Sequence, residues 1–174
     1  MNLEELTKFI PKDNYPEINK DISVEKNVIP MIIDAYSGNR GELTATCQYS
    51  YQSFLLKPTK ELYHKAIEEV SVNEMRHLEI LSQILLYSNI DPKFCRYIDN
   101  NANLPVCWSG SNLNYEKDIK SFLQNNIRAE ERAIEHYKMI IAKTSSENLK
   151  NIIERIIKDE QSHIKIFKTL IDNL

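Results

Sequence analysis

The sequence contains very little glycine and proline, with three and six residues respectively in a chain of 174. Folds rich in β structure need many turns, and turns use these two residue types heavily. Their scarcity therefore favours a few long helices. The length suits one domain with a sizeable core, and the hydrophobic share of 42% and charged share of 27% are ordinary for a globular protein.

Four other features are absent as well. The net charge of −3 gives no electrostatic reason to expect nucleic acid as a partner. No apolar run approaches the roughly 20 residues that cross a bilayer, and the first residues lack the basic and apolar regions of an export signal. The cysteines are Cys47, Cys95 and Cys107, an odd number without a CxxC pair, so we expect no disulfide framework. These absences favour a cytoplasmic protein that binds neither nucleic acid nor membrane.

The spacing of apolar residues predicts a short arm followed by one helical domain. Residues 1–24 are polar and contain two prolines, which predicts an N-terminal arm or short helix outside the core. Across residues 25–174 apolar side chains recur at steps of three and four, as in helices with one buried stripe. We expect four such helices, at about residues 31–52, 59–89, 115–143 and 144–174, with Thr59 as a cap and a capping box formed by Thr144 and Glu147.

The connections between these helices indicate how they pair. The first and second helices, and the third and fourth, are joined by short turns, whereas residues 91–114 form a long connection. Short turns make antiparallel neighbours, so the sequence predicts an all-α four-helix bundle with a long crossover between its second and third helices. Pro30 and the pair Gly38 and Gly41 mark places where the first helix could start late or kink.

Six polar residues interrupt the apolar stripes at positions where core residues belong. The set consists of Glu42, Glu74, His77, Glu130, Glu160 and His163. A buried, unpaired carboxylate costs several kcal/mol, and four carboxylates carry a charge of −4 that two divalent cations would balance. Glu and His three residues apart share a helix face. One Glu from each of two helices and Glu-x-x-His from each of the others is the ligand set of di-iron and di-manganese bundles.

The chain repeats this pattern in its two halves. The motif ExxAxxxY occupies residues 42–49 and 130–137, and a polar residue followed by ExxH occupies 73–77 and 159–163. Two matching hairpins, each supplying half of a site, are what a pseudo-twofold dinuclear centre requires. We expect Tyr49 and Tyr137 to be core aromatics or to hydrogen-bond a carboxylate of the opposite half. Asp159 and Asn73 are candidates to accept the free N–H of a ligating histidine.

The helical phase argues against two competing candidates for metal ligands. Glu131 neighbours Glu130 but lies about 100° off the apolar stripe. A third ExxH begins at Glu61, and it precedes the Glu74 motif by thirteen residues, a rotation of roughly 220° that points it elsewhere. We therefore assign no metal role to Glu61 or His64, and we expect His64 to lie at the surface.

The motifs resemble those of a known superfamily. GNRGELTATCQYSYQSF followed by NEMRHLEILSQIL resembles the first hairpin of manganese catalases and related spore-coat proteins, and NNIRAEERAIEHYKMII followed by IIERIIKDEQSHIKIF is similar to rubrerythrin and bacterioferritin. The resemblance covers residues 38–89 and 117–171. It implies a ferritin-like four-helix bundle, with the six polar residues as ligands of two metal ions, and Glu74 and either Glu160 or Glu130 as bridges.

The departures from these families matter too. No CxxC rubredoxin module is present, and the chain is shorter than a typical manganese catalase. The corresponding glutamate on the last helix of manganese catalases is usually not a direct ligand, so Glu160 is also a candidate catalytic base.

Three functional hypotheses follow from this resemblance. Carboxylate-rich N/O ligation suits iron or manganese, so the first is an oxidoreductase that acts on hydrogen peroxide or dioxygen, catalase-like with manganese or peroxidase-like with iron. The second is iron oxidation and storage, and the third is a structural, coat-type protein. We also expect a homo-oligomer, a dimer or larger. The residues identify no external electron donor.

Overall fold

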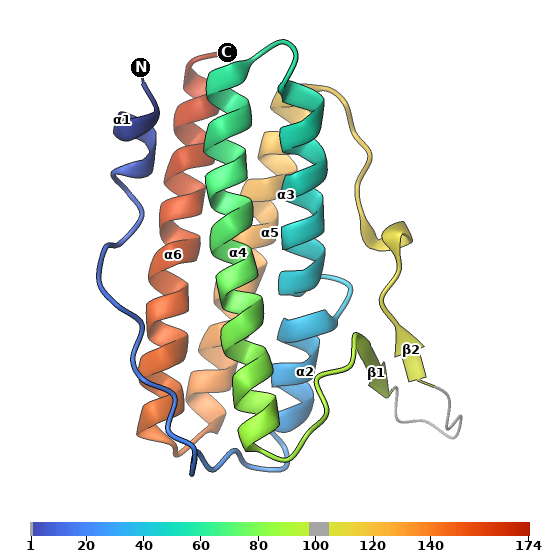
Figure 1. Ribbon diagram of the computed structural model, residues 1–174, viewed down its shortest axis with the longest axis vertical. Helices are drawn as coiled ribbons and strands as arrows, with labels where there is room; N and C mark the ends of the chain where they lie inside the picture. The colour runs from blue at the N-terminus through green and yellow to red at the C-terminus, as the bar shows by residue number, and fades with distance from the viewer. Residues whose placement is uncertain (1, 98–104) are drawn as a thin grey trace.

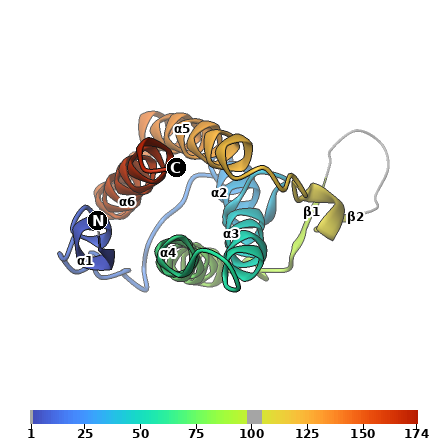
Figure 2. The same ribbon diagram turned by 90° about the horizontal axis from the view of Figure 1, so that it is seen from above.

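The computed structural model describes residues 2–97 and 105–174 and confirms the predicted four-helix bundle (Figure 1). Its elements in chain order are α1 (Leu3–Thr7), α2 (Ile29–Ser37), α3 (Glu42–Leu56), α4 (Glu61–Tyr87), β1 (Cys95–Tyr97), β2 (Pro105–Cys107), η1 (Gly110–Asn112), α5 (Ile119–Lys143) and α6 (Glu147–Asp172). Helices α3 and α4 form one antiparallel pair and α5 and α6 the other, and Figure 2 shows the two pairs facing each other.

The first predicted helix is broken into α2 and α3 at its glycines. A side chain at Gly38 would collide with Asp34, and one at Gly41 would collide with the backbone carbonyls of Asp34 and Ala35. Only glycine allows the chain to pass so close to the end of α2. The break makes Glu42 the first residue of α3, where free backbone N–H groups favour a negative charge.

Two predicted helix caps are wrong. Helix α4 begins at Glu61 after an N-cap without a side-chain hydrogen bond, so Thr59 is not its cap. The capping box predicted at Thr144 is also absent, because Thr144 ends α5. Ser146 caps α6 instead, and its hydroxyl accepts a hydrogen bond from the backbone N–H of Leu149.

The bundle has two apolar clusters rather than one continuous core. One contains Ile80 and Leu85 of α4 with Ile140 and Ile153, near the turn between α5 and α6. The other contains Tyr63, Ala66, Ile67 and Val70 of α4 together with residues from α3, α5 and α6 near the opposite end. On every long helix, the polar residues singled out above fall between these clusters. The candidate site is therefore a polar layer enclosed by apolar packing on both sides.

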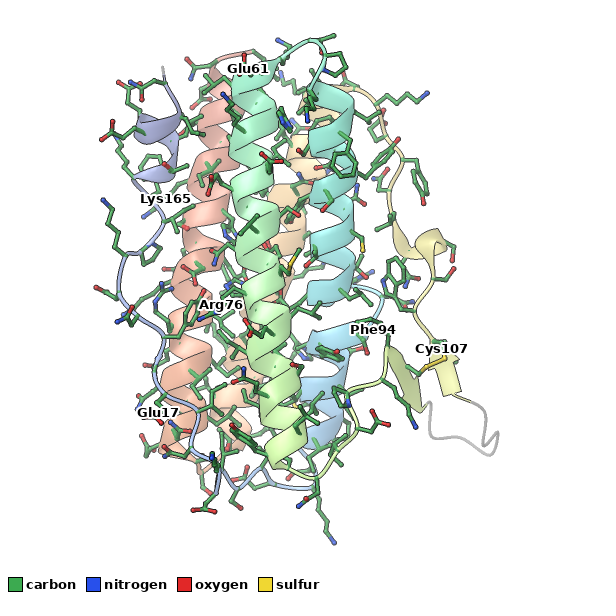
Figure 3. All side chains as sticks on the ribbon, in the orientation of Figure 1. Glu17, Glu61, Arg76, Phe94, Cys107 and Lys165 are labelled. Carbon is green, nitrogen blue, oxygen red and sulfur yellow. A yellow bond between two sulfur atoms is a disulfide. The ribbon has the colours of Figure 1, made fainter. Side chains whose placement is uncertain are left out.

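The crossover contains a small β-hairpin that the sequence did not predict. Strands β1 and β2 pair antiparallel with Cys95 opposite Cys107, and these two cysteines form a disulfide (Figure 3). The expectation of no disulfide framework is therefore wrong for this pair, because the pairing of β1 with β2 brings together two residues that are 12 positions apart in the sequence. Cys47 is free and partly buried. The cysteines therefore no longer support the predicted cytoplasmic location.

The rest of the crossover follows the outer side of α2 and α3. The Tyr36 hydroxyl donates to the backbone carbonyl of Pro92 at 3.0 Å. The Trp108 indole N–H donates to the Thr44 hydroxyl at 2.9 Å, so Trp108 anchors this segment to the start of α3.

The N-terminal arm packs against α4 and α6 instead of standing apart from the bundle (Figures 1 and 2). Leu6 is fully buried in one apolar cluster and Ile22 is buried in the other. The arm was predicted to lie outside the core because it is polar and contains two prolines, and its few buried apolar residues correct that prediction. Within the described residues, no helix is long and apolar enough to cross a membrane.

Candidate metal centre

The fold brings all six predicted polar residues into one buried layer. None of them is more than 4% exposed; they are Glu42 of α3, Glu74 and His77 of α4, Glu130 of α5, and Glu160 and His163 of α6. Each long helix thus contributes to the layer between the two apolar clusters. Side chains of this kind lie in such a place only when their charges are compensated.

The donor atoms fall into two overlapping groups. Ligand atoms of Glu42, Glu74, His77 and Glu160 lie within 4.8 Å of one another, and so do those of Glu74, Glu130, Glu160 and His163. Glu74 and Glu160 belong to both groups. Each group therefore has one histidine and one carboxylate of its own, together with the two shared carboxylates.

Both imidazole rings direct Nδ1 towards the shared carboxylates. His77 Nδ1 lies 3.0 Å from Glu74 Oε2 and 3.2 Å from Glu160 Oε1. His163 Nδ1 lies 2.9 Å from Glu74 Oε1 and 3.0 Å from Glu160 Oε2. The two halves of the site are thus related by the pseudo-twofold symmetry that the sequence repeat predicts.

Without metal ions, the buried carboxylates of this layer repel one another. Burial, and then the charges of Glu74 and Glu160, raises the pKa of the Glu42 and Glu130 carboxyl groups well above the usual range. Burial also acts to raise the pKa of Glu74, but His163 and His77 outweigh it and lower that pKa. Without cations, Glu42 and Glu130 therefore hold protons.

The pKa values of the two histidines are raised as well, although burial acts on them in the opposite direction. Burial acts to lower the pKa of both imidazoles, but the surrounding carboxylates, led by Glu160 for His77 and Glu74 for His163, raise it well above the usual value. The site therefore attracts positive charge strongly, whether as protons or as metal ions.

The donors present fit two divalent cations. Oε1 of Glu74 and Oε1 of Glu160 are buried and make no well-aligned hydrogen bond among the residues that the structure describes, although each lies close to an imidazole Nδ1. Such atoms require an explanation, and a bound ion is one. Oxygen and imidazole donors without a thiolate suit iron or manganese. The donor set, with its two shared carboxylates, fits a dinuclear centre.

Two buried tyrosines hold the outer carboxylates across the halves. The Tyr49 hydroxyl donates to Glu130 Oε1 at 2.5 Å, and the Tyr137 hydroxyl donates to Glu42 Oε1. Burial, and then the charge of the partner glutamate, raises the pKa of both phenols well above the usual value, so they stay protonated. Each tyrosine fixes one carboxylate oxygen by hydrogen bonding.

The outer nitrogens of the two histidines have acceptors as well. His77 Nε2 lies 3.2 Å from Asp159 Oδ2, and His163 Nε2 lies 2.9 Å from Asn73 Oδ1. An acceptor at this position favours the tautomer with the proton on Nε2 and leaves Nδ1 free to bind a metal. The structure thus places Asp159 and Asn73 where they can orient the imidazoles.

Two residues near the site were missed by the sequence analysis. Arg155 is buried and its Nη1 lies 2.5 Å from Asp159 Oδ2. Tyr15, from the arm, donates its hydroxyl hydrogen to the same oxygen at 2.5 Å. The sequence does show an arginine four residues before this aspartate, a spacing that places both on one helix face. Tyr15 left no such signal, because the arm has no periodic pattern.

These contacts determine the charges of Asp159 and Tyr15, which lie beside His77. Burial acts to raise the pKa of Asp159, but hydrogen bonds from His77, Arg155 and Tyr15 lower it, so Asp159 is an anion. Burial, together with the interaction with Asp159, raises the pKa of Tyr15 to about 12, so the phenol keeps its proton.

The rejected candidates lie away from the centre. Glu131 is exposed. Glu61 lies at the far end of α4 (Figure 3), where it pairs with Lys65 at 2.7 Å. His64 is only 6% exposed, so its predicted surface position is wrong; its Nδ1 lies 2.7 Å from the Ser53 hydroxyl, which satisfies the ring inside the core.

A cavity leads from the surface to one side of the centre. It has a volume of about 410 Å³ and lies between α3 and α5, with Glu42, Glu130 and Glu160 in its wall. Asparagine, glutamine and arginine side chains line much of the remainder. A small polar molecule could therefore reach the carboxylates without displacing the apolar clusters.

Comparisons with known proteins agree with this architecture. The rubrerythrin family model matches residues 37–171. A probable manganese catalase from Clostridium acetobutylicum is 23% identical over 152 residues, which cover 79% of this chain and 67% of that protein.

Solved structures share the fold. The crystal structure of a manganese catalase from Anabaena has a TM-score of 0.76 at 21% identity, covering 94% of this chain and 80% of that one. Rhodobacter capsulatus bacterioferritin, solved with a metal-free dinuclear site and haem iron, has a TM-score of 0.67 at 22% identity, covering 87% and 88%. The family match spans all six polar residues and both helical pairs, and on this ground the chain belongs to the rubrerythrin family.

Proposed function

We propose that this protein binds two iron or manganese ions and uses them to consume hydrogen peroxide. The two overlapping groups of four donors carry the proposal. Glu42 and His77 would hold one ion, Glu130 and His163 the other, and Glu74 and Glu160 would be shared. Such a pair of ions can exchange two electrons with one peroxide molecule, because each changes between the +2 and +3 states.

The protein groups around the centre support this chemistry in distinct ways. Tyr49 and Tyr137 each hold one oxygen of an outer carboxylate, which limits how far Glu130 and Glu42 can move. The polar cavity admits a substrate as small as peroxide, and the apolar clusters enclose the layer on either side along the bundle. Glu160 lies in both donor groups and in the cavity wall. If it is not a direct ligand, it is placed to accept a proton from the substrate.

The test is a steady-state peroxide assay on protein loaded separately with manganese and with iron. We expect turnover above that of the free metal in at least one case, and its loss in Glu42→Gln. An iron-loading curve distinguishes storage, which would show rapid ferrous oxidation and many irons per chain. A coat-type structural role would give neither turnover nor accumulation. If neither loaded form exceeds the free metal, the enzymatic proposal fails.

A further inference from the structure

The N-terminal arm reaches the outer side of the candidate metal centre through one residue, Tyr15. Its ring packs edge-on to the His77 ring, with centroids 6.2 Å apart. Arg155 covers its face at 4.4 Å from the guanidinium carbon to the ring centroid, and also donates to the backbone carbonyl oxygens of Pro11 and Asp13. The arm is thus fastened so that the Tyr15 hydroxyl occupies a defined place.

That hydroxyl joins the hydrogen-bond partners of both histidines. It donates to Asp159 Oδ2 at 2.5 Å and accepts from Asn73 Nδ2 at 3.0 Å. Asp159 in turn contacts His77 Nε2, and Asn73 Oδ1 contacts His163 Nε2. A continuous chain of hydrogen bonds therefore runs from one imidazole to the other through a residue outside the four-helix bundle.

The direction of each bond in this chain is determined. Asp159 Oδ2 pairs with the Arg155 guanidinium at 2.5 Å and therefore acts as an acceptor, so the single Tyr15 hydrogen goes to Asp159. The Tyr15 oxygen is then an acceptor towards Asn73, and Asn73 must present its NH₂ group there. The amide oxygen of Asn73 consequently faces His163, where it accepts a hydrogen bond from Nε2–H. This leaves Nδ1 with a lone pair that can bind a metal ion.

We propose that Tyr15 is a positioning residue that fixes the amide orientation of Asn73 and, through it, the tautomer of His163. The inference rests on the metal centre of the proposed function but not on peroxide as the substrate. Without the hydroxyl, the Asn73 amide can rotate by 180° and offer His163 a donor, which favours the wrong tautomer for binding through Nδ1.

The two halves of the centre depend on Tyr15 unequally. His77 is oriented by the carboxylate of Asp159, which accepts in either orientation and remains paired with Arg155 when the phenol is removed. His163 depends on an amide whose two ends differ in hydrogen-bonding capacity. Loss of the hydroxyl should therefore weaken one of the two metal sites, the one containing His163.

The experiment compares Tyr15→Phe with Tyr63→Phe by measuring metal release from manganese-loaded protein to a chelator. Tyr63 is a buried tyrosine whose hydroxyl donates to the Leu170 carbonyl at 3.0 Å in the apolar cluster away from the centre. We expect Tyr15→Phe to release one of its two ions roughly 10-fold faster or more, the size usual for lost outer contacts of a metal ligand. Tyr63→Phe should release both as the wild type does.

A second variant tests the orientation argument itself. In Tyr15→Phe with Asn73→Asp, residue 73 has two equivalent oxygens and can accept from His163 whichever way it turns, so slow release should return. The manganese electron paramagnetic resonance spectrum should change in Tyr15→Phe and revert in the double variant. Equal acceleration of both ions, wild-type release in Tyr15→Phe, or failure of the double variant to restore slow release would each overturn the inference. Wild-type protein that binds no metal would instead refute the proposed function.

Discussion

Replacing Glu130 by glutamine should make the metal-free protein more stable at neutral pH. Glu130 is 2% exposed, and burial together with Glu74 and Glu160 raises its pKa well above the ordinary value of 4.5. In the absence of metal the folded protein must therefore keep this carboxyl group protonated or bury another negative charge. Glutamine removes that requirement and still offers Tyr49 an oxygen acceptor.

The sign and size of the effect follow from proton linkage. Above pH 4.5 the unfolded chain loses the Glu130 proton while the folded chain keeps it, so the free energy of unfolding falls as pH rises. Each such proton contributes about 1.4 kcal/mol per pH unit until the folded pKa is reached. Glu42 has a raised pKa too, and the stability of metal-free wild type should therefore fall as the pH rises from the ordinary carboxyl pKa of 4.5 towards the raised folded values. Glu130→Gln should make that slope shallower by about 1.4 kcal/mol per pH unit.

The assay is urea unfolding in the presence of a chelator, repeated at several pH values. Glu131→Gln is the matched control, because it makes the same chemical change at the exposed neighbouring position and should leave the slope unchanged. Metal binding should show the reverse order, with Glu130→Gln binding less tightly than either wild type or the control. If metal-free wild type became more stable as the pH rose above 4.5, or if Glu130→Gln retained the wild-type slope, the electrostatic account of the site would be wrong.

Two further predictions concern metal content. Changing both Glu74 and Glu160 to alanine should remove bound metal, measured by elemental analysis, while circular dichroism shows a helical protein; two metals per chain in that variant would refute the shared-carboxylate assignment. His64→Ala should lower the free energy of unfolding by about 1–3 kcal/mol, because it leaves a buried hydroxyl without its partner. Its metal content should equal that of wild type, and loss of metal would contradict the distance between His64 and the centre.

The sequence was sufficient to predict the bundle and the composition of the polar layer. A helix must bury one stripe, so a charged residue on that stripe stands out, and six such residues in two matching halves strongly restrict the possibilities. The structure brings these six together in a buried layer. Phase alone also separated Glu130 from Glu131, because adjacent helical residues differ by 100° in direction.

Features set by tertiary contacts could not be predicted in this way. The disulfide between Cys95 and Cys107 depends on a hairpin in a segment without clear periodicity. The burial of His64 depends on its contact with the Ser53 hydroxyl of α3, a contact that the predicted pairing of the two helices does not specify. Tyr15 lies 144 residues from Asp159 in the chain. In each case the informative partner is set by a tertiary contact, and a single sequence contains no signal that joins the two.

The departures from twofold symmetry make the two candidate metal positions chemically different. Glu42 lies at the start of α3, where the helix N-terminus favours negative charge, whereas Glu130 lies inside the continuous helix α5. The equivalent positions 159 and 73 hold an aspartate and an asparagine, so of the two histidines only His77 has a negatively charged partner at its Nε2. A hydrogen bond to a carboxylate makes an imidazole a stronger donor to a metal than one to an amide does. The ion beside His77 is therefore expected to be held more tightly and to favour its higher oxidation state more than the ion beside His163.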